Sequence, residues 1–170
     1  AGAALAEYHK IHLFDVDVAR GDKTESYRES NSIQAGPPQA QSVDTCAGKT
    51  GLSVCYDLRF GELYRALAAQ GAHILSVPSA FTFKTGEAHW ELLLRARAVE
   101  TQCYVIAPNQ CGSHPGGRQT WGHSMMVDPW GRVLAQRAEA TPGVVLAEID
   151  LQQLEDIRRN MPCQQHRKLP

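Results

Sequence analysis

One cysteine stands where the chain could display a nucleophile. In the stretch TGLSVCYDLRFGELY, residues 50–64, a short apolar run from Gly51 to Val54 ends at Cys55. Apolar residues three and four positions apart then predict a helix over Phe60–Gln70. Cys55 is therefore expected where a strand turns into a helix, at the rim where α/β sheets bind ligands and display nucleophiles.

The neighbours of Cys55 decide whether its thiol can react. A cysteine attacks as the thiolate, which a nearby cation, a helix amino terminus or a base stabilises. Position supplies the helix terminus, and the backbone N–H of Tyr56 could donate to an oxyanion. Asp57 and Arg59 are expected to pair with each other and hold the turn. Placement alone leaves open the alternative that Cys55 is a small buried hydrophobic side chain.

Other reactive residue types give weaker signals. The seven histidines include His9 and His12, which lie on opposite sides of an expected strand, and no His/Cys cluster has zinc spacing. We therefore expect no metal. A Cys–His dyad with His89 or His123 stays open. The sequence has no GxGxxG and no P-loop, so no nucleotide and no cofactor are expected.

The elements that must position Cys55 begin with an alternating segment. Tyr8–Val18 is expected to be a strand that contains Lys10, and Ala19–Pro38 to be a long polar loop. Ala40–Cys46 and Thr50–Cys55 are expected to form a hairpin that leads into the cysteine.

The rest of the chain alternates strands with helices. Two successive β–α–β units predict parallel strands with right-handed crossovers, and thus an α/β fold. The expected elements are strands at His73–Val77 and Cys103–Pro108, a loop at Pro78–Glu87, a helix at His89–Gln102, a loop at Gly112–Thr120, strands at Ser124–Val127, Val133–Arg137 and Val144–Ile149, and a helix at Leu151–Asn160, capped by Asp150, before an extended tail.

The composition of the chain excludes several classes of partner. The 170 residues fit a single domain, residues 1–170, and the formal net charge of −1 gives no reason to expect nucleic acid or an anionic membrane. No apolar run approaches the roughly 20 residues of a membrane span. Five cysteines without a CxxC predict reduced thiols in a cytoplasmic protein. The chain begins at Ala1 rather than methionine, which we interpret as part of a longer polypeptide.

Four blocks of sequence resemble the nitrilase superfamily of carbon–nitrogen hydrolases. They are YHKIHLFDVDV, LSVCYDLRFGELY, PSAFTFKTGEAHWELLLRARAVETQCYVIAPNQ and GHSMMVDPWGRV, in the family's order from about Tyr8 to the carboxyl terminus. Within the family the chain looks most like the Nit branch, and His89–Glu91 and Arg95–Arg97 carry that similarity. Members of this branch hydrolyse small ω-amides of dicarboxylic acids, such as α-ketoglutaramate or deaminated glutathione.

The resemblance implies a fold and a catalytic set. The fold would be part of a four-layer α-β-β-α sandwich whose amino-terminal portion is absent, a single partial domain. By motif, Cys55 would be the nucleophile that forms a thioester, Lys10 the lysine that stabilises thiolate and oxyanion, and Glu29 a second glutamate that supports the lysine. Glu91 is the competing carboxylate, and a charge on a helix surface is the simpler interpretation of that residue.

The resemblance also suggests substrate contacts and an assembly. Tyr56, Ser79 and Phe81 are assigned to substrate or oxyanion contacts, with Pro78–Phe83 and Gln110–Thr120 as the loops that shape the pocket. The expected partners are a small-molecule amide and a second copy of the chain, as a homodimer packed through the helices that flank the sheet.

One departure from the family pattern limits this interpretation. The family's general-base glutamate lies upstream of the lysine block, and no glutamate in this chain matches it, because Glu7 is too close to Lys10. We therefore expect the chain alone to be inactive. A non-catalytic scaffold or binding module is the alternative function, and a Cys–His hydrolase of unrelated fold is a third.

Overall fold

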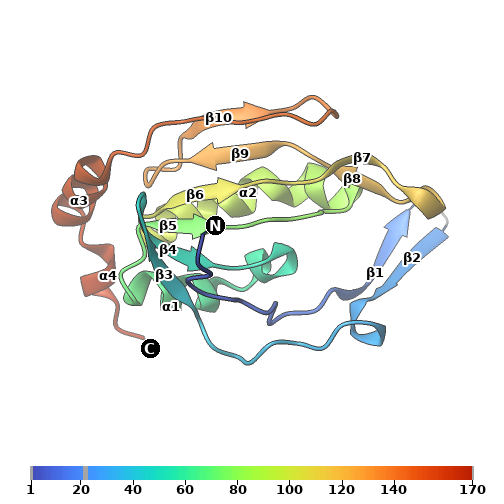
Figure 1. The fold of residues 1–170 in the computed structure, drawn as a ribbon, viewed down its shortest axis with the longest axis horizontal. Helices are drawn as coiled ribbons and strands as arrows, with labels where there is room; N and C mark the ends of the chain where they lie inside the picture. The colour runs from blue at the N-terminus through green and yellow to red at the C-terminus, as the bar shows by residue number, and fades with distance from the viewer. Residues whose placement is uncertain (1, 21–22, 170) are drawn as a thin grey trace.

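A six-stranded mixed sheet forms the centre of the structure, a computed structural model that describes residues 2–20 and 23–169 (Figure 1). The strand order is β10-β9-β6-β5-β4-β3, and β4, β5 and β6 are parallel. The remaining neighbours are antiparallel. The bounds are β3 Ser42–Thr45, β4 Gly48–Leu52, β5 Ile74–Ser76, β6 Tyr104–Ala107, β9 Ser124–Val127 and β10 Val133–Arg137. The predicted parallel strands and α/β class are confirmed.

Two crossover helices cover one face of this sheet. Helices α1, Gly61–Ala69, and α2, Phe83–Thr101, connect the parallel strands and pack against each other. Because side chains alternate along a strand, Leu75 of β5 points into their core, whereas Ile74 packs with Leu154 on the other face. The core beneath the helices also contains the fully buried Tyr64, Leu67, Trp90 and Leu94.

The last long helix, α3, packs through Leu154 against Ile74 and Tyr104, where β5 and β6 begin. It spans Leu151–Asn160 as predicted, and the Asp150 carboxylate caps it by accepting from the N–H groups of Gln152 and Gln153 at 2.9 and 3.1 Å. The predicted extended tail is wrong in part, because a short helix α4 forms at Cys163–His166. The predicted strand Val144–Ile149 is also wrong: these residues pair with no described strand, and Val144 and Leu146 are exposed.

The amino-terminal segment differs most from the prediction. The strand predicted at Tyr8–Val18 begins only at Asp15: β1 is Asp15–Arg20, and Lys10 lies outside it. The long loop predicted at Ala19–Pro38 instead contains strand β2, Lys23–Arg28, and a 3-10 helix at Glu29–Asn31, while residues 21–22 lie outside the described residues. Within residues 2–20 and 23–169, β1 and β2 pair only with each other. Because their outer sides face solvent, polar residues occupy them and hide the strand pattern.

Two further loop predictions are wrong. The loop predicted at Pro78–Glu87 ends earlier, because α2 starts at Phe83. Gly86 lowers the helical signal there, but a Cβ at this position would lie 2.2 Å from the Trp121 Cβ, so the close packing requires glycine. The loop predicted at Gly112–Thr120 is a hairpin of β7, Cys111–Ser113, and β8, Gln119–Trp121, with a 3-10 turn at Pro115–Gly117.

None of the described helices is both long enough and apolar enough to cross a membrane. The cytoplasmic location stays a prediction.

Candidate active site

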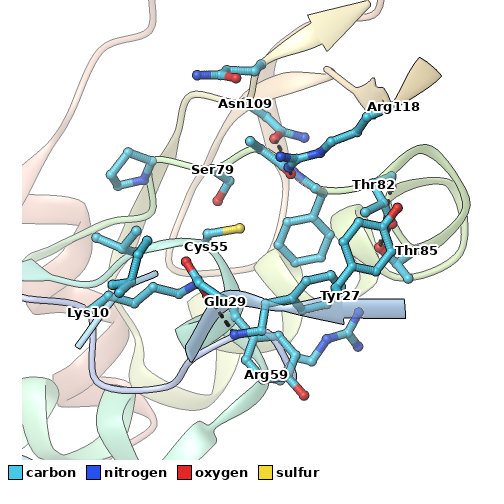
Figure 2. Close-up of a pocket in the computed structure, with 18 of the residues that line it drawn as sticks. Lys10, Tyr27, Glu29, Cys55, Arg59, Ser79, Thr82, Thr85, Asn109 and Arg118 are labelled. Carbon is cyan, nitrogen blue, oxygen red and sulfur yellow. Dashed lines mark hydrogen bonds and ion pairs between the residues drawn. The ribbon is translucent and has the colours of Figure 1, made fainter. Parts of the chain in front are cut away.

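A cavity of about 860 Å³ opens where the three parallel strands end. Val54, Pro78 and Pro108, which follow β4, β5 and β6, line it, and this is the edge where open α/β sheets bind ligands. Figure 2 shows side chains converging on this cavity. All six site residues named from the sequence line it: Lys10, Glu29, Cys55, Tyr56, Ser79 and Phe81.

Cys55, which lines the cavity, occupies a strained backbone conformation. Its φ is 51°, in the left-handed region that residues other than glycine rarely adopt, and such strain clusters at functional sites. The Cys55 N–H donates to the Pro78 carbonyl at 3.0 Å, and the half-buried side chain faces the cavity. The expected helix terminus is only a five-residue 3-10 helix, Cys55–Arg59, since α1 begins at Gly61.

Lys10 reaches the cavity from a segment without regular secondary structure. Its ammonium forms an ion pair with the Glu29 carboxylate, and both side chains are largely buried, at 11% and 22% exposure. Glu29 also accepts from the Phe14 N–H at 2.6 Å. The β1–β2 hairpin returns the chain to its starting point, and in this way it brings Glu29 next to Lys10 despite the 19 residues between them.

The three predicted substrate contacts lie on different walls. Tyr56 packs edge-on against Phe14, with ring centroids 5.0 Å apart. Tyr56 is also in the first turn of a 3-10 helix, where N–H groups have no partner within the helix. Ser79 donates its hydroxyl to the Val77 carbonyl at 3.1 Å. The buried Phe81 packs 4.9 Å from the Trp90 ring.

Besides Arg28, which pairs with Asp17, two further arginines line the cavity and were not assigned to it from the sequence. The Arg59 guanidinium lies over the Tyr56 and Phe81 rings, 5.8 and 5.6 Å from their centroids, and burial lowers the pKa of Arg59. Arg118 donates to the Ala80 carbonyl at 2.9 Å. In the described part of the chain, neither bonds to a carboxylate. Arg118 lies within Gln110–Thr120, which the sequence analysis assigned to the pocket without naming this residue.

Asn109 is a further cavity residue that the sequence analysis did not name. It lies two residues beyond the end of the parallel strand β6, and that position could have identified it. Its side chain accepts from the Phe81 N–H at 3.0 Å and donates to the Gly122 carbonyl at 2.6 Å. Asn109 thus joins two walls of the cavity.

Several alternative assignments do not reach the cavity. The predicted Asp57–Arg59 pair is wrong, because Asp57 bonds to Tyr8 and His12 instead. His89 lies 3.3 Å from an Arg59 nitrogen, and neither it nor His123, which stacks on Trp121, is among the cavity lining. The competing carboxylate Glu91 is half-exposed and pairs with Arg95 at 3.4 Å. Across residues 2–20 and 23–169, no cluster of side chains could hold a metal ion.

Comparison with known proteins places this arrangement in a family. The model of the carbon–nitrogen hydrolase family matches residues 1–159. Human deaminated glutathione amidase is 55% identical over 98% of the chain, which spans 50% of that protein. The Caenorhabditis elegans NitFhit structure is 49% identical with a TM-score of 0.88, covering 96% of this chain and 39% of that one.

A third relative bears on the cysteine. It is a mutant of the amidase from Nesterenkonia sp. AN1, 30% identical with a TM-score of 0.72 over 93% of this chain and 57% of that one. Its structure is described as showing the result of Michael addition of acrylamide at the active site cysteine.

The chain spans about half the length of the curated relatives it matches. The family match, which runs over residues 1–159, does not by itself support an absent amino-terminal portion, and that expectation stays a prediction. The family match and the shared fold show that the chain belongs to the carbon–nitrogen hydrolases of the nitrilase superfamily.

Proposed function

We propose that the protein hydrolyses the C–N bond of a small ω-amide of a dicarboxylic acid, of the α-ketoglutaramate or deaminated-glutathione type, and releases the acid and ammonia. The observation that carries this proposal is the convergence of Cys55, Lys10 and Glu29 in one cavity. The relatives named deaminated glutathione amidase support the substrate class.

The proposed reaction proceeds through a thioester. The Cys55 thiolate attacks the amide carbon, a C–S bond forms, and the carbonyl electrons move to oxygen, where the Lys10 ammonium and the Tyr56 N–H stabilise the negative charge. The nitrogen takes a proton from a general acid and leaves as ammonia when the C–N bond breaks. Water then attacks the thioester carbon and gives a proton back to the group that had protonated the nitrogen, the C–S bond breaks to restore the Cys55 thiolate, and the acid leaves. The acrylamide adduct on the active site cysteine of the Nesterenkonia amidase supports a nucleophilic thiol.

The charge of the cavity favours an anionic substrate. Among the described residues that line it, Glu29 is the single carboxylate, against four cationic side chains: Lys10, Arg28, Arg59 and Arg118. Lys10 is paired with Glu29 and Arg28 with Asp17, which leaves the two remaining arginines for a ligand. A dicarboxylic monoamide presents one carboxylate at the end remote from its amide, and a guanidinium suits such a group.

Replacing Arg59 with methionine is expected to weaken binding of the dicarboxylate product. A charged hydrogen bond contributes about 1.5–3 kcal/mol, so the Kd for α-ketoglutarate should rise about 10- to 150-fold. Isothermal titration calorimetry on the 170-residue chain measures this Kd. Arg65→Met, on the exposed side of α1, is the matched control and should leave it unchanged. An unchanged Kd in the Arg59 variant would contradict the assignment.

The 170-residue chain on its own is expected to release no ammonia from an ω-amide. The family's general base is a glutamate upstream of Lys10, and the only described carboxylate in the cavity, Glu29, is already paired with the lysine. A coupled ammonia assay on the purified chain tests this. Ammonia release that depends on Cys55 would show that the base is supplied within the chain.

The same shortage of carboxylates favours a second candidate, a non-catalytic scaffold or binding module. Absence of turnover in a longer protein that carries the upstream glutamate would favour it over the amidase. The small-molecule partner, a homodimer packed through α1 and α2, and the single partial domain over residues 1–170 likewise stay predictions.

A further inference from the structure

The segment that carries Lys10 needs an anchor outside the sheet. Residues 8–14 belong to no described strand. No ladder of backbone hydrogen bonds between strands therefore fixes the position of Lys10 or the direction of its side chain. In the backbone, the Lys10 carbonyl accepts from the Gly36 N–H at 2.8 Å. At the end of the side chain, the ammonium pairs with the Glu29 carboxylate. Neither contact ties the segment to the turn that displays Cys55.

One buried carboxyl group makes that connection. Asp57 is 0% exposed. It bonds to Tyr8 and to His12, which lie two residues before and two residues after Lys10. The Tyr8 hydroxyl donates to Oδ2 at 2.8 Å, and the His12 backbone N–H donates to Oδ1 at 3.0 Å. The His12 Nδ1 atom lies 2.7 Å from the same Oδ1. These contacts tie the chain on both sides of Lys10 to the turn that contains Cys55.

In the hydrogen bond between Tyr8 and Asp57, the tyrosine hydroxyl remains the donor. Burial, with the nearby Asp57 carboxylate, raises the pKa of the Tyr8 hydroxyl, so the phenol stays protonated and remains a donor. The His12 ring stacks on Phe60, with centroids 3.7 Å apart and planes 6° from parallel. Phe60 immediately precedes α1, so this stacking also attaches the Lys10 segment to the element that follows the cysteine.

The same Asp57 side chain closes the turn that contains Cys55. Its Oδ2 accepts from the Val54 N–H at 2.9 Å, and its own N–H donates to the Val54 carbonyl at 3.1 Å. Cys55, with its left-handed φ of 51°, lies between these two residues. A single carboxyl group therefore holds both the cysteine turn and the lysine segment, and moving it would change the distance between the two reactive groups.

We propose that Asp57 is a positioning residue that sets Lys10 against Cys55 through Tyr8 and His12. This inference rests on the proposed function for the roles of Lys10 and Cys55. Asp57 itself lies outside the cavity lining and acts only through the two residues.

The test measures the reactivity of Cys55 in the 170-residue chain. Iodoacetamide alkylates thiolates, and mass spectrometry of the peptide that contains Cys55 separates its rate from those of the other four cysteines. The thiolate is the reacting form, and a cation held beside it favours alkylation, so moving that cation away slows the reaction. Asp57→Asn and Tyr8→Phe are expected to slow alkylation, Asp57→Asn about tenfold and Tyr8→Phe about threefold.

A double-mutant cycle distinguishes positioning from a purely structural role. If Asp57 acts through Lys10, Asp57→Asn and Tyr8→Phe should slow alkylation no further in a Lys10→Met background. Tyr64→Phe is the matched control, because it removes another buried tyrosine hydroxyl, bonded to Ser53 at 2.8 Å, and should leave the rate unchanged. Tyr8→Phe keeps the ring and decides the question even if Asp57→Asn does not fold.

Two results would overturn the proposal. One is wild-type alkylation in a folded Tyr8→Phe or Asp57→Asn chain, and the other is equal slowing with and without Lys10. Alkylation requires no amide hydrolysis, so a failure to release ammonia from any amide would count against the proposed function alone.

Discussion

Replacing Cys55 with alanine or serine is expected to abolish amide turnover, by roughly 10⁴-fold or more, in a full-length protein that contains this chain. Neither side chain can form a thioester. Alanine has no nucleophilic atom, and a serine hydroxyl, which could form only an ester, is far less ionised than a thiol near neutral pH. The measurement is ammonia release from α-ketoglutaramate at saturating substrate, with unfolding in urea as the check on the fold.

The fold should survive this change. Cys55 is half-buried at the edge of the cavity, and the contact that fixes its backbone is its N–H bond to the Pro78 carbonyl, which any residue except proline can make. Cys46→Ala is the control, since Cys46 is exposed and lies outside the cavity lining. Turnover retained by either Cys55 variant would remove this residue from the role of nucleophile.

Replacing Lys10 with methionine is expected to lower kcat by roughly 10²- to 10³-fold with a smaller effect on KM. The ammonium stabilises charge that develops on the amide oxygen and on sulfur, so its loss affects the transition state more than the bound substrate. Methionine keeps most of the length of the lysine side chain without its charge. The Michaelis parameters for α-ketoglutaramate in the full-length protein provide the measurement.

Glu29→Gln tests the partner of the lysine in the same assay. The amide can still accept from the Phe14 N–H and from Lys10, but it leaves the ammonium without a counter-charge, so a loss smaller than that of Lys10→Met is expected. Lys49→Met is the matched control, because Lys49 lies in β4 and outside the cavity lining. A Lys10→Met protein with unchanged kcat would contradict the oxyanion role.

The periodic elements of the fold were predictable because their signal is local. Strands β5, β6 and β9 are buried along most of their length, helices α1 and α3 bury one side, and this burial imposes a pattern on consecutive residues. The β1–β2 hairpin has little such burial, since among the described residues it pairs only with itself, and its polar outer residues predict a loop. Val144–Ile149 shows the opposite error, since the segment is rich in apolar residues but pairs with no described strand, and Val144 and Leu146 remain exposed.

The candidate site was predictable as a set of residues and not as a geometry. The six residues assigned from motifs all line one cavity. What holds them there was missed, because the anchors join residues far apart in the sequence: Tyr8 and His12 meet Asp57 across 49 and 45 positions. No periodicity encodes such contacts. For the same reason, the sequence paired Asp57 with nearby Arg59, whereas burial among polar donors directs the aspartate to Tyr8 and His12.

The central claim is that Cys55 forms the acyl intermediate, and one measurement tests it directly. Full-length protein is mixed with α-ketoglutaramate, quenched in acid during turnover, digested, and analysed by mass spectrometry for the added acyl group. The account predicts a thioester on the peptide that contains Cys55, absent in the Cys55→Ala protein. Turnover with the acyl group on another residue, or with no acyl group on Cys55, would contradict it.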